Sequence, residues 1–155
     1  MVKYCGHYIT FQEVPNEVAL TFPISNCPYR CEGCHSPWLQ TDMGDELTPK
    51  IILRLLDKYQ GAITCVCFMG TGIDKSALRK LIVWVYCWGY KVCIYTGGSI
   101  EEAKDYFHPD YFKEGPYIAT LGGLNSPNTN QRMWKMNHSE RKYHDITSWF
   151  WRKKE

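Results

Sequence analysis

The sequence lacks any apolar run long enough to cross a lipid bilayer. Its longest such run, near residues 81–88, is far shorter than the ~20 residues that a membrane-spanning helix needs. The first residues, MVKYCGHYITFQE, contain no apolar stretch followed by a small-residue cleavage site, so no targeting signal is visible. These absences predict a cytoplasmic protein with no membrane partner. In that reducing compartment, clustered cysteines indicate metal binding or chemistry more often than disulfides.

A strong charge imbalance is also missing, because 18 Lys and Arg against 16 Asp and Glu leave a formal net charge of +2. This charge is too small to indicate direct nucleic-acid binding by itself. The basic end, WRKKE, is expected to be a solvated terminus rather than a binding patch. No internal repeat or low-complexity segment is present, and the length predicts a single domain over residues 1–155.

The chain alternates apolar, β-branched runs with helical patterns. Strands are predicted at residues 18–24, 62–69, 91–96 and 117–121. Helices are predicted from Pro49 to about Gly61, from about Lys75 to Trp88, and to about Phe107 after a capping box of Ser99 and Glu102. This alternation indicates βα units, so we predict an α/β fold: an open doubly wound sheet or a partial (βα) barrel of mostly parallel strands.

In such folds the carboxyl ends of the parallel strands carry the functional site. Here these ends read CPYRCEGCHSPW, MGTGID, YTGG and LGGLNSPNTN, and all are rich in Gly, Asn, Thr or Cys. The first end contains Cys27, Cys31 and Cys34, with no apolar periodicity around them that would bury them. They are therefore predicted to be ligands. Apolar surroundings predict core packing for the cysteines at positions 65, 67, 87 and 93.

Three clustered thiolates leave two kinds of metal site open. A structural zinc site needs four ligands, so His35, Cys5 or His7 would have to add the fourth, and the sequence has no second CxxC pair. An iron–sulfur cluster bound by three cysteines keeps one iron free for another molecule, as catalytic metal sites do. Under this second interpretation the missing fourth cysteine is the functional feature.

The spacing Cys-x3-Cys-x2-Cys after a first strand, with glycine-rich strand ends behind it, resembles the radical S-adenosylmethionine superfamily. Gly33 stands where the commonest form of that superfamily has an aromatic residue. With a glycine before the third cysteine and a chain this short, the sequence resembles the activating enzymes of anaerobic (class III) ribonucleotide reductase. The stretches CHSPW, CVCFMGTG, IYTG, GLNSPNTNQRMWK and DITSWFW agree with that family, and the resemblance extends from about residue 19 to residue 151.

The resemblance implies a partial barrel in which Cys27, Cys31 and Cys34 bind a [4Fe-4S] cluster whose open iron binds S-adenosylmethionine. Members of the family cleave this cofactor to methionine and a 5′-deoxyadenosyl radical, which takes a hydrogen atom from one glycine of the reductase. An external donor such as flavodoxin supplies the electron. A barrel that is open on one side suits a protein loop as substrate.

The resemblance also assigns residues to S-adenosylmethionine: Gly33, Cys34, His35, Gly70, Thr71, Gly72, Asp74, Tyr95, Thr96, Gly97 and Asn125. Residues 33–35 would reach the adenine, and residues 95–97 the ribose or carboxylate. MGTGID takes the place of a GGE motif that binds the methionyl amine, with Asp74 as its nearest acid. A helix cap for Asp74, a plain turn at Gly97 and a turn or partner contact for Asn125 fit the residues equally well.

Two other functions stay open from the sequence: a radical enzyme of the same superfamily acting on a small molecule, and a non-catalytic zinc-binding module. The aromatic residues Trp84, Tyr86 and Trp88 are predicted to pack in the core or along a helix. Trp134, Trp149 and Trp151 are predicted to belong either to the core or to a docking face for the reductase.

Overall fold

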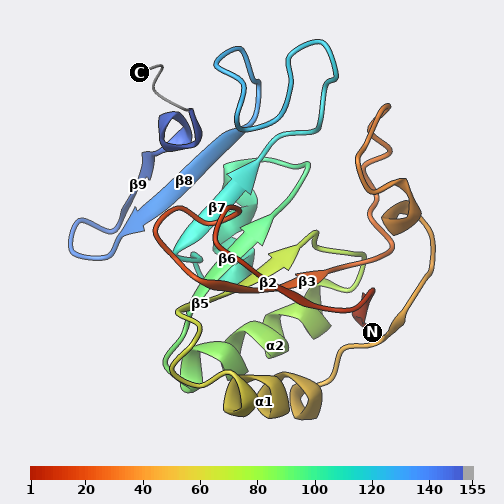
Figure 1. The fold of residues 1–155 in the computed structure, drawn as a ribbon, viewed down its shortest axis with the longest axis vertical. Coiled ribbons are helices and arrows are strands. Elements are labelled where there is room, and N and C mark those ends of the chain that lie inside the picture. The colour runs from red at the N-terminus through yellow and green to blue at the C-terminus, as the bar shows by residue number, and fades with distance from the viewer. Residues whose placement is uncertain (152–155) are drawn as a thin grey trace.

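The computed structural model describes residues 1–151, so most of the WRKKE segment lies outside the described residues. Its centre is a mixed sheet of seven strands (Figure 1). In spatial order these are β2 (Tyr8–Thr10), β3 (Ala19–Pro23), β5 (Cys65–Met69), β6 (Lys91–Tyr95), β7 (Tyr111–Glu114), β8 (Arg132–Asn137) and β9 (Lys142–Asp145). Strands β3, β5, β6 and β7 are parallel, whereas β2, β8 and β9 pair antiparallel with their neighbours. Over residues 1–151 the sheet does not close into a barrel, because β2 and β9 are free edges.

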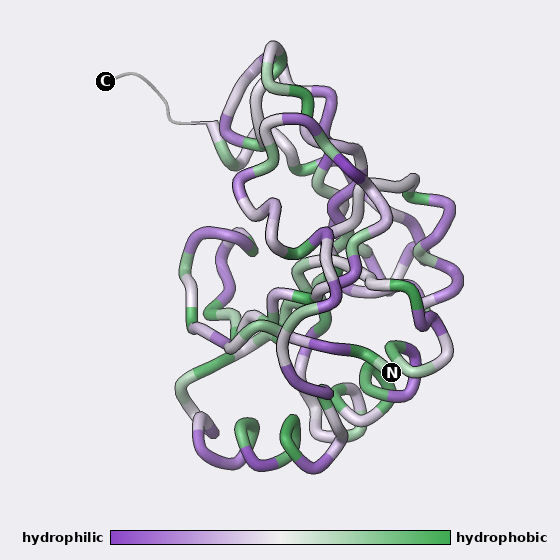
Figure 2. Tube along the Cα trace, turned by 90° about the vertical axis from the view of Figure 1, so that its right-hand side faces the viewer, coloured by the Kyte–Doolittle hydropathy of each residue, from purple (hydrophilic) through white to green (hydrophobic). Residues whose placement is uncertain are grey.

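Helices α1 (Pro49–Lys58) and α2 (Lys75–Cys87) lie side by side against one face of this sheet (Figure 1). The Thr48 hydroxyl caps α1 by accepting a hydrogen bond from the Ile51 amide at 3.3 Å, and Pro49 begins the helix, as predicted. The helical turns at the bottom of Figure 2 alternate between hydrophobic and hydrophilic colours, which is typical of helices with one buried face. No helix within residues 1–151 has both the length and the apolar character needed to cross a membrane.

Smaller elements complete the fold. Strands β1 (Lys3–Tyr4) and β4 (Asp45–Glu46) form a separate two-stranded sheet. The 3-10 helices are η1 (Pro37–Gln40), η2 (Ile100–Tyr106) and η3 (Thr147–Phe150). The third predicted helix is therefore a 3-10 helix, and its capping box is wrong. The Ser99 hydroxyl does cap η2, accepting from the Glu101 amide at 3.2 Å. The Glu102 carboxylate instead accepts a hydrogen bond from Tyr29, which lies in the cysteine loop, residues 24–36.

Each face of the sheet has its own apolar core. On the helix-covered face, Phe22 and Phe68 stack across β3 and β5 with ring centroids 6.0 Å apart, in one cluster with Ile52 of α1 and Leu78 of α2. On the other face, Cys65, Cys67 and Cys93 are fully buried together with Tyr111 and Met133. Core packing of these three cysteines is confirmed.

The fourth predicted strand is wrong. Residues 117–121 form a turn in which Ile118 is 40% and Leu121 36% exposed, and the strand is instead β7, which ends before Gly115 and Pro116. The β7 sequence YFKE places a lysine and a glutamate in a four-residue strand, whereas YIATL is apolar and β-branched. Burial by neighbouring strands overrides these local preferences, because β7 pairs on one side with β6 and on the other with β8.

Three side chains at the end of α2 lie outside the core. Cys87 is exposed, so its predicted core packing is wrong. Trp84 and the C-cap residue Trp88 are 42% and 47% exposed, which excludes the core and leaves packing along the helix. Tyr86 does pack against the core of the helix-covered face. The helix is amphipathic, and its buried positions are occupied by Leu78, Leu81, Ile82 and Val85, which leaves the positions between them in solvent.

The packing of α2 predicts a difference between two residues of the same helix. Leu78 is fully buried and Val83 is 44% exposed. Leu78→Ala should lower the free energy of unfolding by about 2–5 kcal/mol, because it leaves a cavity under the sheet. Val83→Ala should change it by less than about 0.5 kcal/mol. Urea denaturation followed by circular dichroism measures both, and equal losses in the two variants would contradict the placement of this helix.

Candidate metal and cofactor site

The candidate site lies where the four parallel strands end. The register aligns one residue from the end of each strand in a single row: Pro23, Met69, Tyr95 and Lys113. Backbone hydrogen bonds from the Ile24 amide to Met69 O and from the Gly70 amide to Tyr95 O, both 3.0 Å, continue this alignment beyond the row. Because the strands run in one direction, the four segments that follow them leave the sheet at the same edge.

The cysteine loop follows β3 directly. It is drawn in orange in Figure 1, at the side of the sheet toward which the arrowheads of β5, β6 and β7 point. Two backbone hydrogen bonds close its base, from the Asn26 amide to Thr41 O at 3.1 Å and from the Cys27 amide to Leu39 O at 2.8 Å. Leu39 belongs to η1 and is buried, so the return of the loop is anchored in the protein.

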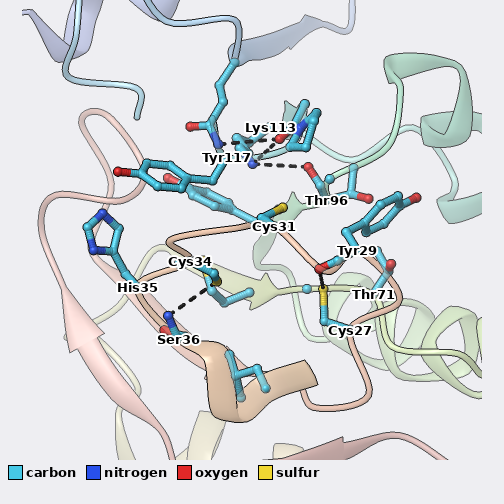
Figure 3. A pocket seen from close by; sticks show the side chains of 18 of the residues that line it. Cys27, Tyr29, Cys31, Cys34, His35, Ser36, Thr71, Thr96, Lys113 and Tyr117 are labelled. Carbon is cyan, nitrogen blue, oxygen red and sulfur yellow. Dashed lines mark hydrogen bonds between the residues drawn. The ribbon is translucent and has the colours of Figure 1, made fainter. Parts of the chain in front are cut away.

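The cysteine loop and the strand ends enclose a cavity of about 260 Å³ (Figure 3). Most of the residues predicted for the site line it: Cys27, Cys31, Cys34, His35, Gly70, Thr71, Tyr95, Thr96 and Gly97. Residues from three predicted strand ends thus come together with all three predicted metal ligands. The fourth contribution comes from the segment after β7, through Gly115 and Tyr117, and Gly123 of the LGGLNSPNTN stretch also lines the cavity.

Four residues predicted for the site do not line this cavity: Gly33, Gly72, Asp74 and Asn125. Gly33 turns the loop with φ +72° and packs toward Tyr117, to whose ring a Cβ would approach within 3.6 Å. Asp74 has the capping role, because its side chain accepts a hydrogen bond from the Ala77 amide at 3.0 Å at the start of α2. Asn125 lines a second, larger cavity of about 1,020 Å³.

This second cavity adjoins the first, because Tyr95 lines both. It lies between the segment that follows β2 and the C-terminal part of the described chain, with Phe11, Trp149 and Trp151 among its residues. Trp149 is 50% exposed, whereas the Trp151 indole N–H donates to Leu124 O at 3.1 Å. Of the three tryptophans left open between core and docking face, Trp149 and Trp151 border this cavity.

The three cysteines of the loop are free thiols, and each is partly buried. The Cys27 thiol donates to Tyr29 O at 3.5 Å, and the Cys34 sulfur accepts from the Ser36 amide at 3.4 Å. Burial raises the pKa of Cys27, and the negative charges of Cys31 and Cys34 raise it further. A bound cation reverses such a shift, because a coordinated thiol is deprotonated.

The potential metal ligands of the cavity are mainly soft sulfur atoms, those of its three free cysteines. Within residues 1–151, no three Cys, His, Asp or Glu side chains are close enough together to hold one metal ion. Of the three residues considered for a fourth zinc ligand, only His35 lines the cavity, where its ring lies 5.0 Å from that of Tyr117. His7 instead packs near Phe22 and Tyr59, with ring centroids 6.3 Å away from each.

Lys113 is a charged cavity residue that the sequence patterns did not indicate. It lines the cavity from β7 and is only 8% exposed, and its Nζ donates to Thr96 O at 3.2 Å and to Gly115 O at 2.7 Å. Burial lowers the pKa of this amine from 10.5 to about 8, against the opposing attraction of the cysteine thiolates. A cation at the edge of the cavity offers a partner for a carboxylate. Placing β7 correctly would have revealed Lys113 as a charged residue inside a buried strand.

This burial predicts a specific dependence of stability on pH. In the unfolded chain Lys113 keeps its proton up to its ordinary pKa of 10.5, but in the folded protein it loses it near pH 8. Between these values the unfolded state binds more protons, so the wild type gains stability as the pH rises. Relative to Lys113→Met, which has no such proton, the wild type should gain up to about 3 kcal/mol between pH 8 and 10.5.

Chemical denaturation at several pH values, in the presence of reductant, measures this relative gain. Lys50→Met is the matched control, because Lys50 is an exposed lysine on α1. Its stability curve should stay parallel to that of the wild type. A Lys113→Met curve that is also parallel to the wild type would contradict the buried position of the amine.

No protein-family model, curated protein or solved structure matches the chain. What the site can bind therefore has to be inferred from its own residues. These are three partly buried thiols, a buried lysine and glycine-rich strand ends around one cavity.

Proposed function

We propose that this chain is a radical S-adenosylmethionine enzyme that activates an anaerobic ribonucleotide reductase by generating a radical on one of its glycines. The observation that carries the proposal is that Cys27, Cys31 and Cys34 line the same cavity as the ends of the parallel strands. A second support is the resemblance of the motifs that these strand ends carry. We infer that the open sheet corresponds to the partial barrel that the resemblance implies.

The three loop cysteines would hold the [4Fe-4S] cluster. Each cysteine of such a cluster binds a different iron, so the thiols have to surround a space rather than meet at one point. One zinc ion would need its sulfur ligands within about 4 Å of each other, given its tetrahedral Zn–S bonds. The arrangement of thiols around a cavity favours the cluster over the closed zinc site, whose fourth ligand would have to be His35.

The remaining cavity residues would hold S-adenosylmethionine. The chemistry available when both groups are bound is reductive cleavage of S-adenosylmethionine to methionine and a 5′-deoxyadenosyl radical, which takes a hydrogen atom from a glycine Cα. The Lys113 ammonium suits the carboxylate of the methionyl part through a charge-assisted hydrogen bond. Gly70 and Thr71 bring main-chain groups to the cavity from the end of β5. These residues bind and orient the cofactor and exclude water.

The edge of the sheet bears on the kind of substrate. Strands β8 and β9 return antiparallel rather than adding further βα units, so the parallel part of the sheet stops at β7. The second cavity, bordered by Trp149 and Trp151, then lies open beside Tyr95. We therefore favour a segment of the reductase over a small molecule as substrate, with the electron supplied by an external donor such as flavodoxin.

The proposal predicts that Cys31→Ala abolishes both cluster binding and activation. The variant should hold less than one tenth of the iron of the wild type after anaerobic reconstitution, and no glycyl radical should form. Electron paramagnetic resonance of a mixture with reductant, S-adenosylmethionine and the reductase of the same organism measures the radical. Cys87→Ala is the control, because Cys87 is an exposed cysteine on α2 away from the cavity.

Other outcomes separate the alternatives. Cleavage of S-adenosylmethionine without a glycyl radical would contradict the substrate and leave a radical enzyme acting on a small molecule. A colourless protein that holds one zinc would contradict the cluster and support the zinc-binding module. A Cys31→Ala variant that still activates the reductase would contradict the assignment of the ligands.

A further inference from the structure

Tyr29 lies midway between Cys27 and Cys31 and turns inward while its neighbours face solvent. Pro28 and Arg30 are exposed, whereas Tyr29 is partly buried and lines the cavity (Figure 3). Its ring lies against the turn that follows β6. A Cβ added at Gly97 would lie 2.6 Å from Tyr29 Cγ and 2.9 Å from both Tyr29 Cβ and Cδ2. No side chain larger than hydrogen fits at Gly97 while the tyrosine ring occupies this position.

The hydroxyl of Tyr29 reaches the same region of the protein. It donates a hydrogen bond to Glu102 Oε1 at 3.2 Å, and a Cβ at Gly98 would come within 2.5 Å of it. This hydrogen bond joins the segment between Cys27 and Cys34 to η2. The ring and the hydroxyl therefore attach the middle of the cysteine loop to the end of β6 and to η2.

The turn that receives the ring is itself firmly held. The Thr96 amide donates to Lys113 O at 2.9 Å, and the Gly115 amide donates to Gly98 O at 2.9 Å, which ties the turn to β7. Within the turn, the Gly98 amide donates to the Thr96 hydroxyl at 3.0 Å. Tyr29 thus connects a loop with few attachments to a turn that has many.

We propose that Tyr29 is the positioning residue of the cysteine loop, and that Gly97 is a glycine because it admits the Tyr29 ring. Holding the residue between Cys27 and Cys31 in place limits how far their thiols can move relative to each other. The inference rests on the proposed function only for the identity of the group that these thiols bind. It also gives Gly97 a different role from the cofactor contact expected from the sequence. The two accounts predict different results when both positions are changed together.

The test uses four variants: Tyr29→Phe, Tyr29→Ala, Gly97→Ala and the double variant with both alanines. Amide hydrogen–deuterium exchange of the metal-free protein in reductant, resolved by mass spectrometry, reports the order of residues 26–36. Tyr29→Ala and Gly97→Ala should each speed exchange in this segment about tenfold or more, by freeing the loop to open locally. Tyr29→Phe keeps the ring and should restore most of the protection. Exchange in β5 should stay unchanged in all variants and shows that they are folded.

The double variant decides the role of Gly97. With the ring removed, the two ring contacts at 2.6 and 2.9 Å are gone. Only the Cβ at position 29 stays near the new methyl group, on a loop that is already free to shift, so the double variant should exchange like Tyr29→Ala alone. After anaerobic reconstitution, cluster loss to an iron chelator should follow the same order, with an increase of about tenfold for Tyr29→Ala, as is usual when a residue supporting a metal ligand is removed. The electron paramagnetic resonance spectrum of the reduced cluster should broaden in Tyr29→Ala and recover in Tyr29→Phe.

Two results would overturn the inference: wild-type exchange in Tyr29→Ala, or a Gly97→Ala effect that is as large without the tyrosine ring as with it. If Tyr29→Ala does not fold, Tyr29→Phe and Gly97→Ala still decide, because only the second should loosen the loop. Failure of the proposed function looks different. A wild-type protein that takes up no iron would contradict the cluster, while exchange in the metal-free variants would still report on Tyr29.

Discussion

The fold depends on the parallel alignment of β3, β5, β6 and β7. Because these four strands run in one direction, the loops that follow them all leave the same edge of the sheet, and the register of the strands determines the level at which each loop begins. The row Pro23, Met69, Tyr95 and Lys113 sets the level at which the loops begin. Every residue of the candidate cavity lies in this row or follows it in the chain, and the segment after β7 contributes residues as far along as Gln131. A slip of one residue in any pair would turn its side chains to the other face of the sheet. The cavity therefore depends on the apolar pattern of the strands as much as on the cysteines.

The electrostatics of the cavity follow from burying one cation beside three ionisable thiols. An isolated ammonium is costly to remove from water, and Lys113 offsets part of that cost through Thr96 O and Gly115 O. The same two carbonyls belong to the turn after β6 and to the segment after β7, so the amine also links these two walls. A cavity built this way has a positive group at one side and sulfur ligands at another. This combination suits a ligand that carries a carboxylate and reaches a metal centre.

Sequence patterns predicted the parts of this fold that local chemistry determines. The strands at β3, β5 and β6 are continuous apolar runs, α1 has a threonine cap followed by proline, and the cysteine loop has a spacing that apolar packing does not explain. A strand was wrongly predicted at residues 117–121 because their β-branched and apolar side chains are typical of strands. The actual strand, β7, contains the charged residue Lys113 among buried residues, which is atypical of a strand. The contact of Tyr29 with Gly97 lies beyond any local pattern, since it joins positions far apart in the chain. Asp74 fitted two roles from the sequence, and its hydrogen bond to the Ala77 amide assigns the cap.

The central claim is that the three loop cysteines hold a cluster with one iron open to S-adenosylmethionine. The most direct measurement is electron paramagnetic resonance of the anaerobically reconstituted, reduced protein, recorded before and after addition of S-adenosylmethionine. A cluster signal whose shape changes when S-adenosylmethionine is added, together with about four irons per chain, is the result expected for a cluster with three protein ligands. A protein without iron, or a cluster signal that S-adenosylmethionine leaves unchanged, would contradict the account.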